Sequence, residues 1–416
     1  MRARRALLAT LLALLAGCSV RERANPFDPG NPDTGGTPVG FVALAGSNRV
    51  TLRWQPVIGE QLVGYQVFRK TAAETTYRAV TAVLDPRTTG TTDFALANGI
   101  EHAYRLFYVL PSGLAPRYAE DVATPGHALP WIVDAGRGVL ARLTPDGRRV
   151  AFERTGFSAP TAVASDTTDG RVWVSDNLGG SVTSFDPSTG VAVTIPGLSS
   201  PGTIAVNPGD HSGWVCDERQ NLIHHFTPAG DPATLPIAPL ARPIGVAVDP
   251  TDGGVLICER DGNRVRRHHP GGPLLWTRTV DAPSRVAVDR VRRDAWVTSF
   301  ETGRVTRLGL DGTVLDVVDG FSGPIGIAVD SRRGLVWVTE ALAGRVTVVT
   351  LDGDVQFRIS GIPETRDVSV DPETGDGWVV APGSGEVLRL SSDGAVLRRL
   401  GGFDLPYGIT LDPGVR

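Results

Sequence analysis

Acidic residues recur at one position of a repeat that fills the second half of the chain. The position is held by Asp134, Asp176, Asp217, Glu259 and Glu340. A ring of carboxylates can hold a cation or a cationic ligand, because hard cations prefer oxygen ligands. Arg264 follows Glu259 and Arg345 follows Glu340 by five residues, so each carboxylate can instead cap its own hairpin turn and pair with an arginine. Recurrence favours this structural role, and Glu259 and Glu340 remain candidate ligand-binding residues.

A second candidate site is a pair of charges at a repeated position that is otherwise small. Two residues after the proline of each repeat, or its counterpart, stand Ala162, Thr203, Gly245, Arg285, Gly326, Asp367 and Gly408. If the repeats close into a ring, this position opens the innermost strand of each repeat, near the mouth of the central channel, where a ligand can bind. Arg285 and Asp367 therefore predict either a salt bridge across the mouth or a site that binds the two ends of a small polar or zwitterionic ligand.

Other chemistry-bearing residues form no motif that predicts catalysis or metal binding. His224-His225 and His268-His269 are adjacent in sequence. Neighbouring residues of a strand point to opposite faces, so neither pair can chelate a metal through both rings. The sequence has no nucleophile elbow, zinc-protease helix or phosphate loop, and its net charge of −4 argues against nucleic-acid binding. No cofactor or catalytic residue is predicted, although the channel leaves room for a structural cation.

The repeat that carries these positions consists of short strands separated by turns. In one copy the strands are Ile325–Val329, Leu335–Thr339 and Arg345–Val349. The residue that ends the first strand recurs every 40 to 42 residues, at Asp166, Asn207, Asp249, Asp289, Asp330, Asp371 and Asp412. Seven residues after the first six stand Trp173, Trp214, Leu256, Trp296, Trp337 and Trp378. This period with one large apolar residue per unit is typical of propeller blades.

The two ends of the repeat array predict how the ring closes. Residues 406–412 form a first strand without a blade, whereas residues 131–152 supply later strands without a first. The fragments complete each other, which gives seven blades and protects the sheet edges. The predicted fold is therefore all-β: a β-sandwich followed by a seven-bladed β-propeller, over residues 128–416, closed by pairing of its N- and C-terminal strands.

The pattern Pro-x-Gly-Ile-Ala-Val-Asp, then Val-Trp-Val, then Asp-Gly resembles the NHL/YVTN-type β-propellers over roughly residues 130–413. These propellers include scaffolds, ligand binders and a few lyases and lactonases, so the resemblance implies a fold and leaves the activity open. Val338-Thr339-Glu340 is similar to a segment of streptogramin-lyase propellers. No position of this chain matches their catalytic histidine.

The N-terminal residues predict export and anchoring. Residues 1–18 combine a basic start, a short apolar run and the sequence Leu15-Ala-Gly-Cys18, which resembles the bacterial lipobox. The resemblance implies cleavage before Cys18, lipidation of Cys18 and, because Ser19 follows, an outer-membrane lipoprotein that faces the periplasm or the cell surface. The alternative is an ordinary secretory peptide with an incidental cysteine. Residues 19–37 are rich in proline and glycine and are predicted to be a disordered tether.

Residues 38–125 alternate apolar and polar residues in short runs. Val50-Thr-Leu-Arg-Trp54 and Gly64-Tyr-Gln-Val67 resemble a fibronectin type III module. In the propeller, Cys216 and Cys258 are predicted to be free, buried thiols. The whole chain is interpreted as a lipid-anchored cell-envelope protein whose propeller binds an unknown protein, glycan or small polar ligand, or acts as a scaffold. The alternative is a propeller enzyme, a lyase or lactonase, that acts at the channel mouth.

Overall fold

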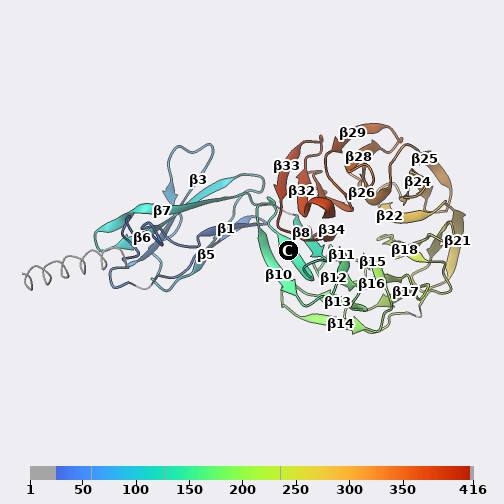
Figure 1. The fold of residues 1–416 in the computed structure, drawn as a ribbon, viewed down its shortest axis with the longest axis horizontal. Helices are drawn as coiled ribbons and strands as arrows, with labels where there is room; N and C mark the ends of the chain where they lie inside the picture. Colours follow the sequence, from blue (N-terminus) through green and yellow to red (C-terminus); the bar gives the residue numbers. More distant parts are fainter. Residues whose placement is uncertain (1–24, 58, 127, 235, 413–416) are drawn as a thin grey trace, which may run out of the picture. The chain divides into compact units, whose positions relative to one another are not determined.

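The computed structural model describes residues 25–57, 59–126, 128–234 and 236–412 of the 416-residue chain. The chain divides into two compact units, residues 1–126 and 127–416. Strands dominate both units (Figure 1), and the described residues add one 3-10 turn, Pro382–Ser384. Within the described ranges, no helix is long and apolar enough to cross a membrane. Cys18 and the predicted signal peptide lie outside the described residues.

The first unit packs two antiparallel sheets around an aromatic core. One sheet has the order β1 (Val42–Gly46), β2 (Arg49–Arg53), β5 (Gly90–Phe94). The other has the order β4 (Arg78–Ala79), β3 (Gly64–Thr71), β6 (His102–Leu110), β7 (Gly113–Ala123). Trp54, Tyr65, Tyr104 and Tyr108 are buried in the core that these strands share. Alternation of apolar and polar residues along the strands is what gives each sheet one buried face.

Residues 25–37, which the sequence assigns to the tether, form a series of turns against this core. Phe27 is buried and lies edge-to-face with Tyr108, with 5.0 Å between the ring centroids. The Tyr108 hydroxyl donates a hydrogen bond to the Thr37 carbonyl at 3.2 Å. The polar composition of the segment does not predict that Phe27 packs in the core and holds residues 25–37 against the folded unit.

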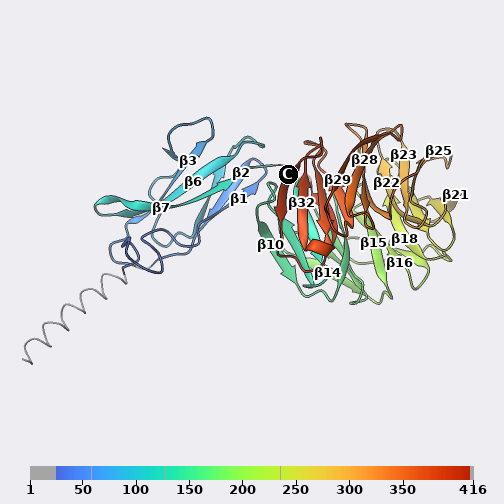
Figure 2. The same cartoon turned by 45° about the horizontal axis from the view of Figure 1, so that its top comes forward.

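The second unit is a succession of antiparallel sheets, a β-propeller (Figure 2). One sheet joins both ends of the unit, and the other sheets follow in chain order. The next three are β11 (Pro160–Ser165), β12 (Val172–Asp176), β13 (Ser181–Phe185) and β14 (Ala192–Pro196); β15 (Pro201–Asn207), β16 (Ser212–Asp217) and β17 (Leu222–Phe226); and β18 (Pro243–Val248), β19 (Val255–Glu259), β20 (Arg264–His268) and β21 (Leu274–Thr279). The last three are β22 (Pro283–Asp289), β23 (Asp294–Ser299), β24 (Arg304–Gly309) and β25 (Val314–Val318); β26 (Pro324–Asp330), β27 (Leu335–Glu340), β28 (Arg345–Thr350) and β29 (Val355–Ser360); and β30 (Asp367–Val370), β31 (Gly377–Ala381), β32 (Glu386–Leu390) and β33 (Val396–Leu400). The first strand of each sheet lies toward the centre and the last strand at the rim (Figure 1).

The sheet that joins both ends of the unit has the order β10 (Val150–Thr155), β9 (Val139–Leu143), β8 (Leu129–Asp134), β34 (Pro406–Asp412). The register runs from Pro406 opposite Asp134 to Asp412 opposite Leu129. The Asp134 carboxylate also accepts hydrogen bonds from the amides of Asp404 and Leu405, which are 270 and 271 residues away in sequence. The first strands β11, β15, β18, β22, β26, β30 and β34 contact one another in a closed cycle. The two ends of the unit therefore share a sheet, as the sequence predicts.

The tryptophans at the repeated position fill the spaces between sheets. Trp131, Trp173, Trp214, Trp296, Trp337 and Trp378 are at most 2% exposed. Glycine in the following sheet admits some of these rings, since a Cβ on Gly213 would lie 2.9 Å from Trp173 and one on Gly377 would lie 2.5 Å from Trp337. Cys216 and Cys258 are free and buried, as predicted, and burial raises the pKa of both thiols.

Candidate functional site

A polar pocket of about 450 Å³ opens on the central axis of the propeller. Every first strand, or the residue just before it, contributes to its wall. We call it the mouth pocket and define it by its charged and aromatic lining residues: Glu218, Arg242, Arg260, Arg285, Phe300, Arg366 and Tyr407. Glu218 and Arg260 directly follow second strands, whereas Arg242 and Arg366 directly precede first strands. The mouth pocket therefore depends on closure of the ring, because its residues come from sheets far apart in sequence.

Positive charge prevails in the mouth pocket. The Nε of Arg242 lies 3.6 Å from Oε2 of Glu218, and its Nη1 lies 3.8 Å from Asp261. Arg260 pairs with Glu301. Among the described residues, no ion pair engages Arg285 or Arg366. Two of the four guanidinium groups are thus left without an ion-paired acid in the part of the chain that the structure describes.

Arg366 is held by an aromatic ring. Its guanidinium lies over the ring of Tyr407, 3.8 Å from the centroid, which is a favourable cation–π geometry. The Nε of Arg366 is buried and has no hydrogen-bond partner. Burial, reinforced by the nearby positive charge of Arg285, lowers the pKa of Arg366. Arg366 is thus half-buried, and its Nε still has a proton to donate.

The predicted pair Arg285 and Asp367 is not joined by an ion pair among the described residues. Arg285 lines the mouth pocket, whereas the Asp367 carboxylate accepts hydrogen bonds from the amides of Val368 at 3.0 Å and Ile409 at 3.2 Å. Burial raises the pKa of Asp367, and the charge of Arg285 opposes that shift. Asp367 therefore bonds across the seam to β34, the next first strand.

The small residues at the same repeated position lie in the seams between first strands. A Cβ on Gly245 would come within 2.5 Å of the Ser284 carbonyl oxygen, and one on Gly326 within 2.7 Å of that of Arg366. Thr203 uses its hydroxyl to donate a hydrogen bond of 2.6 Å to the Ile244 carbonyl. Close approach of neighbouring backbones, rather than access to a ligand, explains why this position is small.

Glu259 and Glu340 are fully buried and already have partners. Glu259 accepts hydrogen bonds from Arg264 and the Ala241 amide, and Glu340 accepts them from Arg345 and the Ser322 amide. Burial alone would raise the pKa of Glu340, but its hydrogen bonds hold that pKa below its ordinary value.

The other repeated acids make similar bonds to the loop before their sheet. Asp176 accepts from the amides of Ser158 and Ala159, and Asp217 from those of Ser199 and Ser200. These bonds give the repeated carboxylate a structural role in the sheets that carry it. Neither Glu259 nor Glu340 is part of the mouth pocket lining.

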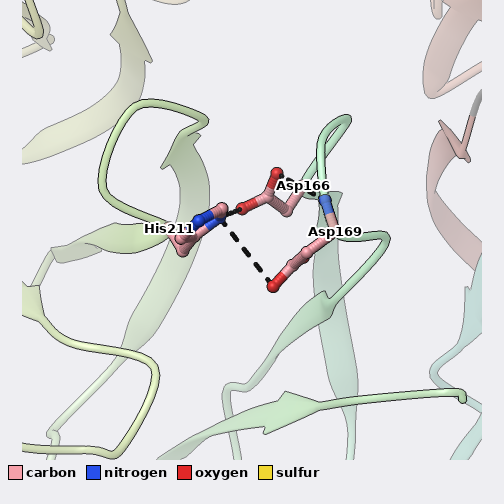
Figure 3. A group of neighbouring side chains, drawn as sticks. All are labelled: Asp166, Asp169 and His211. Carbon is pink, nitrogen blue, oxygen red and sulfur yellow. Dashed lines mark hydrogen bonds and ion pairs between the residues drawn. The ribbon is translucent and has the colours of Figure 1, made fainter.

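A second cluster of ionisable groups lies between two turns (Figure 3). Asp166 and Asp169 follow β11, and His211 lies between β15 and β16. His211 Nδ1 is 2.7 Å from Asp166 Oδ2 and 3.8 Å from Asp169 Oδ2. A separation of 2.7 Å is a hydrogen-bond length. It is shorter than the spacing between two ligands that each lie about 2.0–2.2 Å from a zinc ion in tetrahedral geometry. The hydrogen bond with Asp166 raises the pKa of His211, so the cluster is an ionic link between neighbouring sheets.

Sequence reasoning found Arg285 but missed the rest of the mouth pocket. Glu218 and Arg260 occupy the position directly after the repeated acid, where other repeats have Asn177, Phe300 and Ala341. The sequence could have revealed Glu218 and Arg260, because charged residues replace uncharged ones at this position while the surrounding repeat stays regular. Arg366 and Tyr407 gave no such signal, because they lie together only after β30 and β34 become neighbours in the ring.

The sequence model of the virginiamycin B lyase family matches residues 153–414. The chain belongs to this family. No curated protein matches the chain. The family match covers nearly all of the propeller and includes every residue that defines the mouth pocket.

Solved structures share the fold of this virginiamycin B lyase family member at low identity. A streptogramin B lyase aligns over 60% of this chain and 86% of its own, with 15% identity and a TM-score of 0.53. A catalytically inactive histidine-to-alanine variant of virginiamycin B lyase from Staphylococcus aureus, with quinupristin, aligns over 61% and 92%, with 16% identity and a TM-score of 0.53. A putative 6-phosphogluconolactonase from Bacteroides uniformis aligns over 68% and 99%, with 14% identity and a TM-score of 0.58. Membership of the virginiamycin B lyase family fits the alternative prediction of a propeller enzyme better than the binding or scaffold interpretation.

Proposed function

We propose that the protein is a β-propeller enzyme of the lyase or lactonase type that opens a small polar ester or lactone in the mouth pocket. The observation that carries the proposal is the presence of a carboxylate, Glu218, in an axial pocket that also holds two arginines for which the described residues supply no ion pair. Membership of the virginiamycin B lyase family supports the reaction class. Axial pockets of this kind are common ligand sites in propellers.

Glu218 is the candidate general base. In an elimination it would take a proton from the carbon next to a carbonyl, the C–H electron pair would form the new double bond, and the ester oxygen would leave as a carboxylate. In a lactone hydrolysis it would instead take a proton from the attacking water. The Glu218 side chain is 32% exposed, so a ligand in the mouth pocket can reach it.

Arg285 and Arg366 are the candidate groups that stabilise negative charge in this reaction. Either reaction builds charge on a carbonyl oxygen, and hydrogen-bond donors held in place near that oxygen stabilise such charge. None of the lining residues of the mouth pocket is a histidine. The proposal therefore assigns the base to a carboxylate and transfers no histidine chemistry from other propellers.

The test follows ring opening of two probes, quinupristin and 6-phosphogluconolactone, by mass spectrometry with the purified protein. We expect opening of at least one probe by the parent and a loss of about 100-fold or more in Glu218→Gln, because general-base catalysis contributes about that much. Glu373→Gln, an exposed acid in the turn between β30 and β31, is the matched control and should keep full activity. Equal activity of Glu218→Gln and the parent would contradict the assignment of the base.

A binding or scaffold role without turnover is the second candidate. It is favoured by the contact between Arg242 and Glu218, which opposes the action of Glu218 as a base. If the parent binds a probe in the mouth pocket but opens neither ring, this second candidate replaces the enzyme proposal.

We further infer a seven-bladed ring, a fibronectin type III-like spacer and a lipid anchor on Cys18. The closed cycle of first strands from β11 to β34 supports the blade number, and the two packed sheets of the first unit support the spacer. The sequence Leu15-Ala-Gly-Cys18 supports attachment to the outer membrane. Two or more acyl chains would be needed for a stable anchor, since one chain binds only marginally.

A further inference from the structure

We propose that the mouth pocket binds an oxyanion group of its substrate, a phosphate or a carboxylate, through the guanidinium groups of Arg285 and Arg366. The inference rests on the proposed function in one respect, because it takes the oxyanion to be part of the molecule that is opened. The substrate class would then be an anionic ester or lactone. Binding of the oxyanion itself depends only on the charges and contacts of the mouth pocket.

The first argument is uncompensated charge. The lining includes four arginines and one glutamate, and the acids next to the pocket engage only Arg242 and Arg260. Burial lowers the pKa of Arg366, and the nearby positive charge of Arg285 lowers it further. Two like charges kept together in a partly dehydrated pocket destabilise the protein unless an anion binds between them.

The second argument is that nearby acidic groups do not neutralise this charge. Asp367 directs its carboxylate oxygens to the amides of Val368 and Ile409, and burial favours its neutral form. Burial raises the pKa values of the Cys216 and Cys258 thiols by more than the charge of Arg285 lowers them, so both thiols are neutral near pH 7. Among the described residues, no acidic side chain therefore forms an ion pair with Arg285, and the Asp367 carboxylate is bonded to backbone amides instead.

The third argument is that Arg366 is already oriented. Stacking on Tyr407 fixes the plane of the guanidinium, which reduces the conformational entropy that binding would cost. Its buried Nε lacks an acceptor, and a guanidinium fork matches two oxygens of a phosphate or carboxylate. An oxyanion would supply both the missing acceptor and the missing charge.

Calorimetric titration of the purified protein with inorganic phosphate and with succinate tests the proposal, and the two probes distinguish a phosphate from a carboxylate preference. We expect at least one probe to bind, and Arg285→Gln and Arg366→Gln each to weaken binding by about 10- to 100-fold, as is usual for loss of one charge-assisted hydrogen bond. Arg358→Gln is the matched control, because Arg358 is an exposed arginine of the rim strand β29. Thermal unfolding of every variant shows whether it is folded.

Tyr407 provides a finer comparison. Tyr407→Phe keeps the ring under Arg366 and should keep phosphate or succinate affinity within about threefold, whereas Tyr407→Ala removes the ring and should weaken binding. Binding of neither probe by the parent would overturn the proposal. Unchanged affinity in folded Arg285→Gln and Arg366→Gln would overturn it as well.

Glu218→Gln separates this inference from the proposed reaction. Removing a negative charge from the mouth pocket should leave affinity for the oxyanion probe unchanged or raise it, even though ring opening is lost. If the oxyanion binds but no ring opens, the reaction fails and the oxyanion site stands. If rings open without dependence on Arg285 or Arg366, the oxyanion site fails and the reaction stands.

Discussion

Removal of β34 is the strongest perturbation that the fold offers, because this strand joins the two ends of the propeller. A chain that ends at Asp404 loses the register between β34 and β8 and the hydrogen bond from the Leu405 amide to Asp134. It also exposes the edge of β8, and an unpaired strand edge is a template for aggregation. We expect the truncated protein to aggregate or to lose its cooperative unfolding transition.

The size of the loss follows from what β34 buries. Ile409 and Leu411 are 4% and 7% exposed, and full burial of such a side chain contributes about 1.5–3 kcal/mol. Each backbone hydrogen bond of the lost ladder adds about 1 kcal/mol. The two side chains alone contribute about 3–6 kcal/mol. With the ladder added, the loss is comparable with the whole free energy of unfolding of a typical domain, about 5–15 kcal/mol.

Scanning calorimetry and size-exclusion chromatography measure this effect. The control is a chain that ends at Asp412, which keeps every pair between β34 and β8 and should melt like the parent. A chain that ends at Asp404, stays monomeric and melts within a few degrees of the parent would refute the shared sheet. The reasoning on ring closure would then be wrong.

Three further predictions concern a seam, an ionic link and the anchor. Gly326→Ala should cost about 1–3 kcal/mol in unfolding free energy, because its Cβ would meet a neighbouring carbonyl, whereas Gly401→Ala, with open space around it, should be nearly neutral by chemical denaturation. His211→Ala should lower the free energy of unfolding by about 1 kcal/mol or less. The pKa of His211 is raised and that of Asp166 is lowered in the folded protein, so the difference in stability between variant and parent should be greatest between about pH 4 and 6.5. This difference should shrink as the pH rises through the pKa of His211. Cys18→Ser should accumulate as an unlipidated precursor in fractionated cells, and normal membrane-bound mature protein would contradict the lipobox assignment.

The sequence predicts those parts of the propeller that repeat. The period of 40 to 42 residues predicts where the strands lie. Trp173 and its counterparts predict which side chains fill the spaces between sheets, because every sheet packs on its neighbours in the same way. The pairing of β34 with β8 was also predictable, since each chain end supplies strands that the other lacks.

The candidate site was less predictable because it is built from departures from the repeat. Arg285 was found as a charge at a position that is otherwise small. The sequence could not show that Asp367, at the same repeated position, accepts a hydrogen bond from the Ile409 amide and forms no ion pair with Arg285 among the described residues. Whether Arg366 meets Tyr407 depends on the loop conformation before β30 and on closure of the ring, neither of which leaves a periodic signal. Similarly, the polar composition of residues 25–37 indicates a tether, whereas one buried residue, Phe27, determines the packing of the described part.

The bonds from Asp404 and Leu405 to Asp134 also have a consequence for biosynthesis. A ribosome adds about 5–20 residues per second, so the interval between synthesis of Asp134 and of its partners 270 residues later is on the order of tens of seconds. Throughout that interval one edge of β8 is unpaired, and the sheets already synthesised form only part of the ring. A message that terminates early can never supply the missing strand. Pairing of β34 with β8 therefore requires that synthesis has passed residue 412, and until then the edge of β8 stays open.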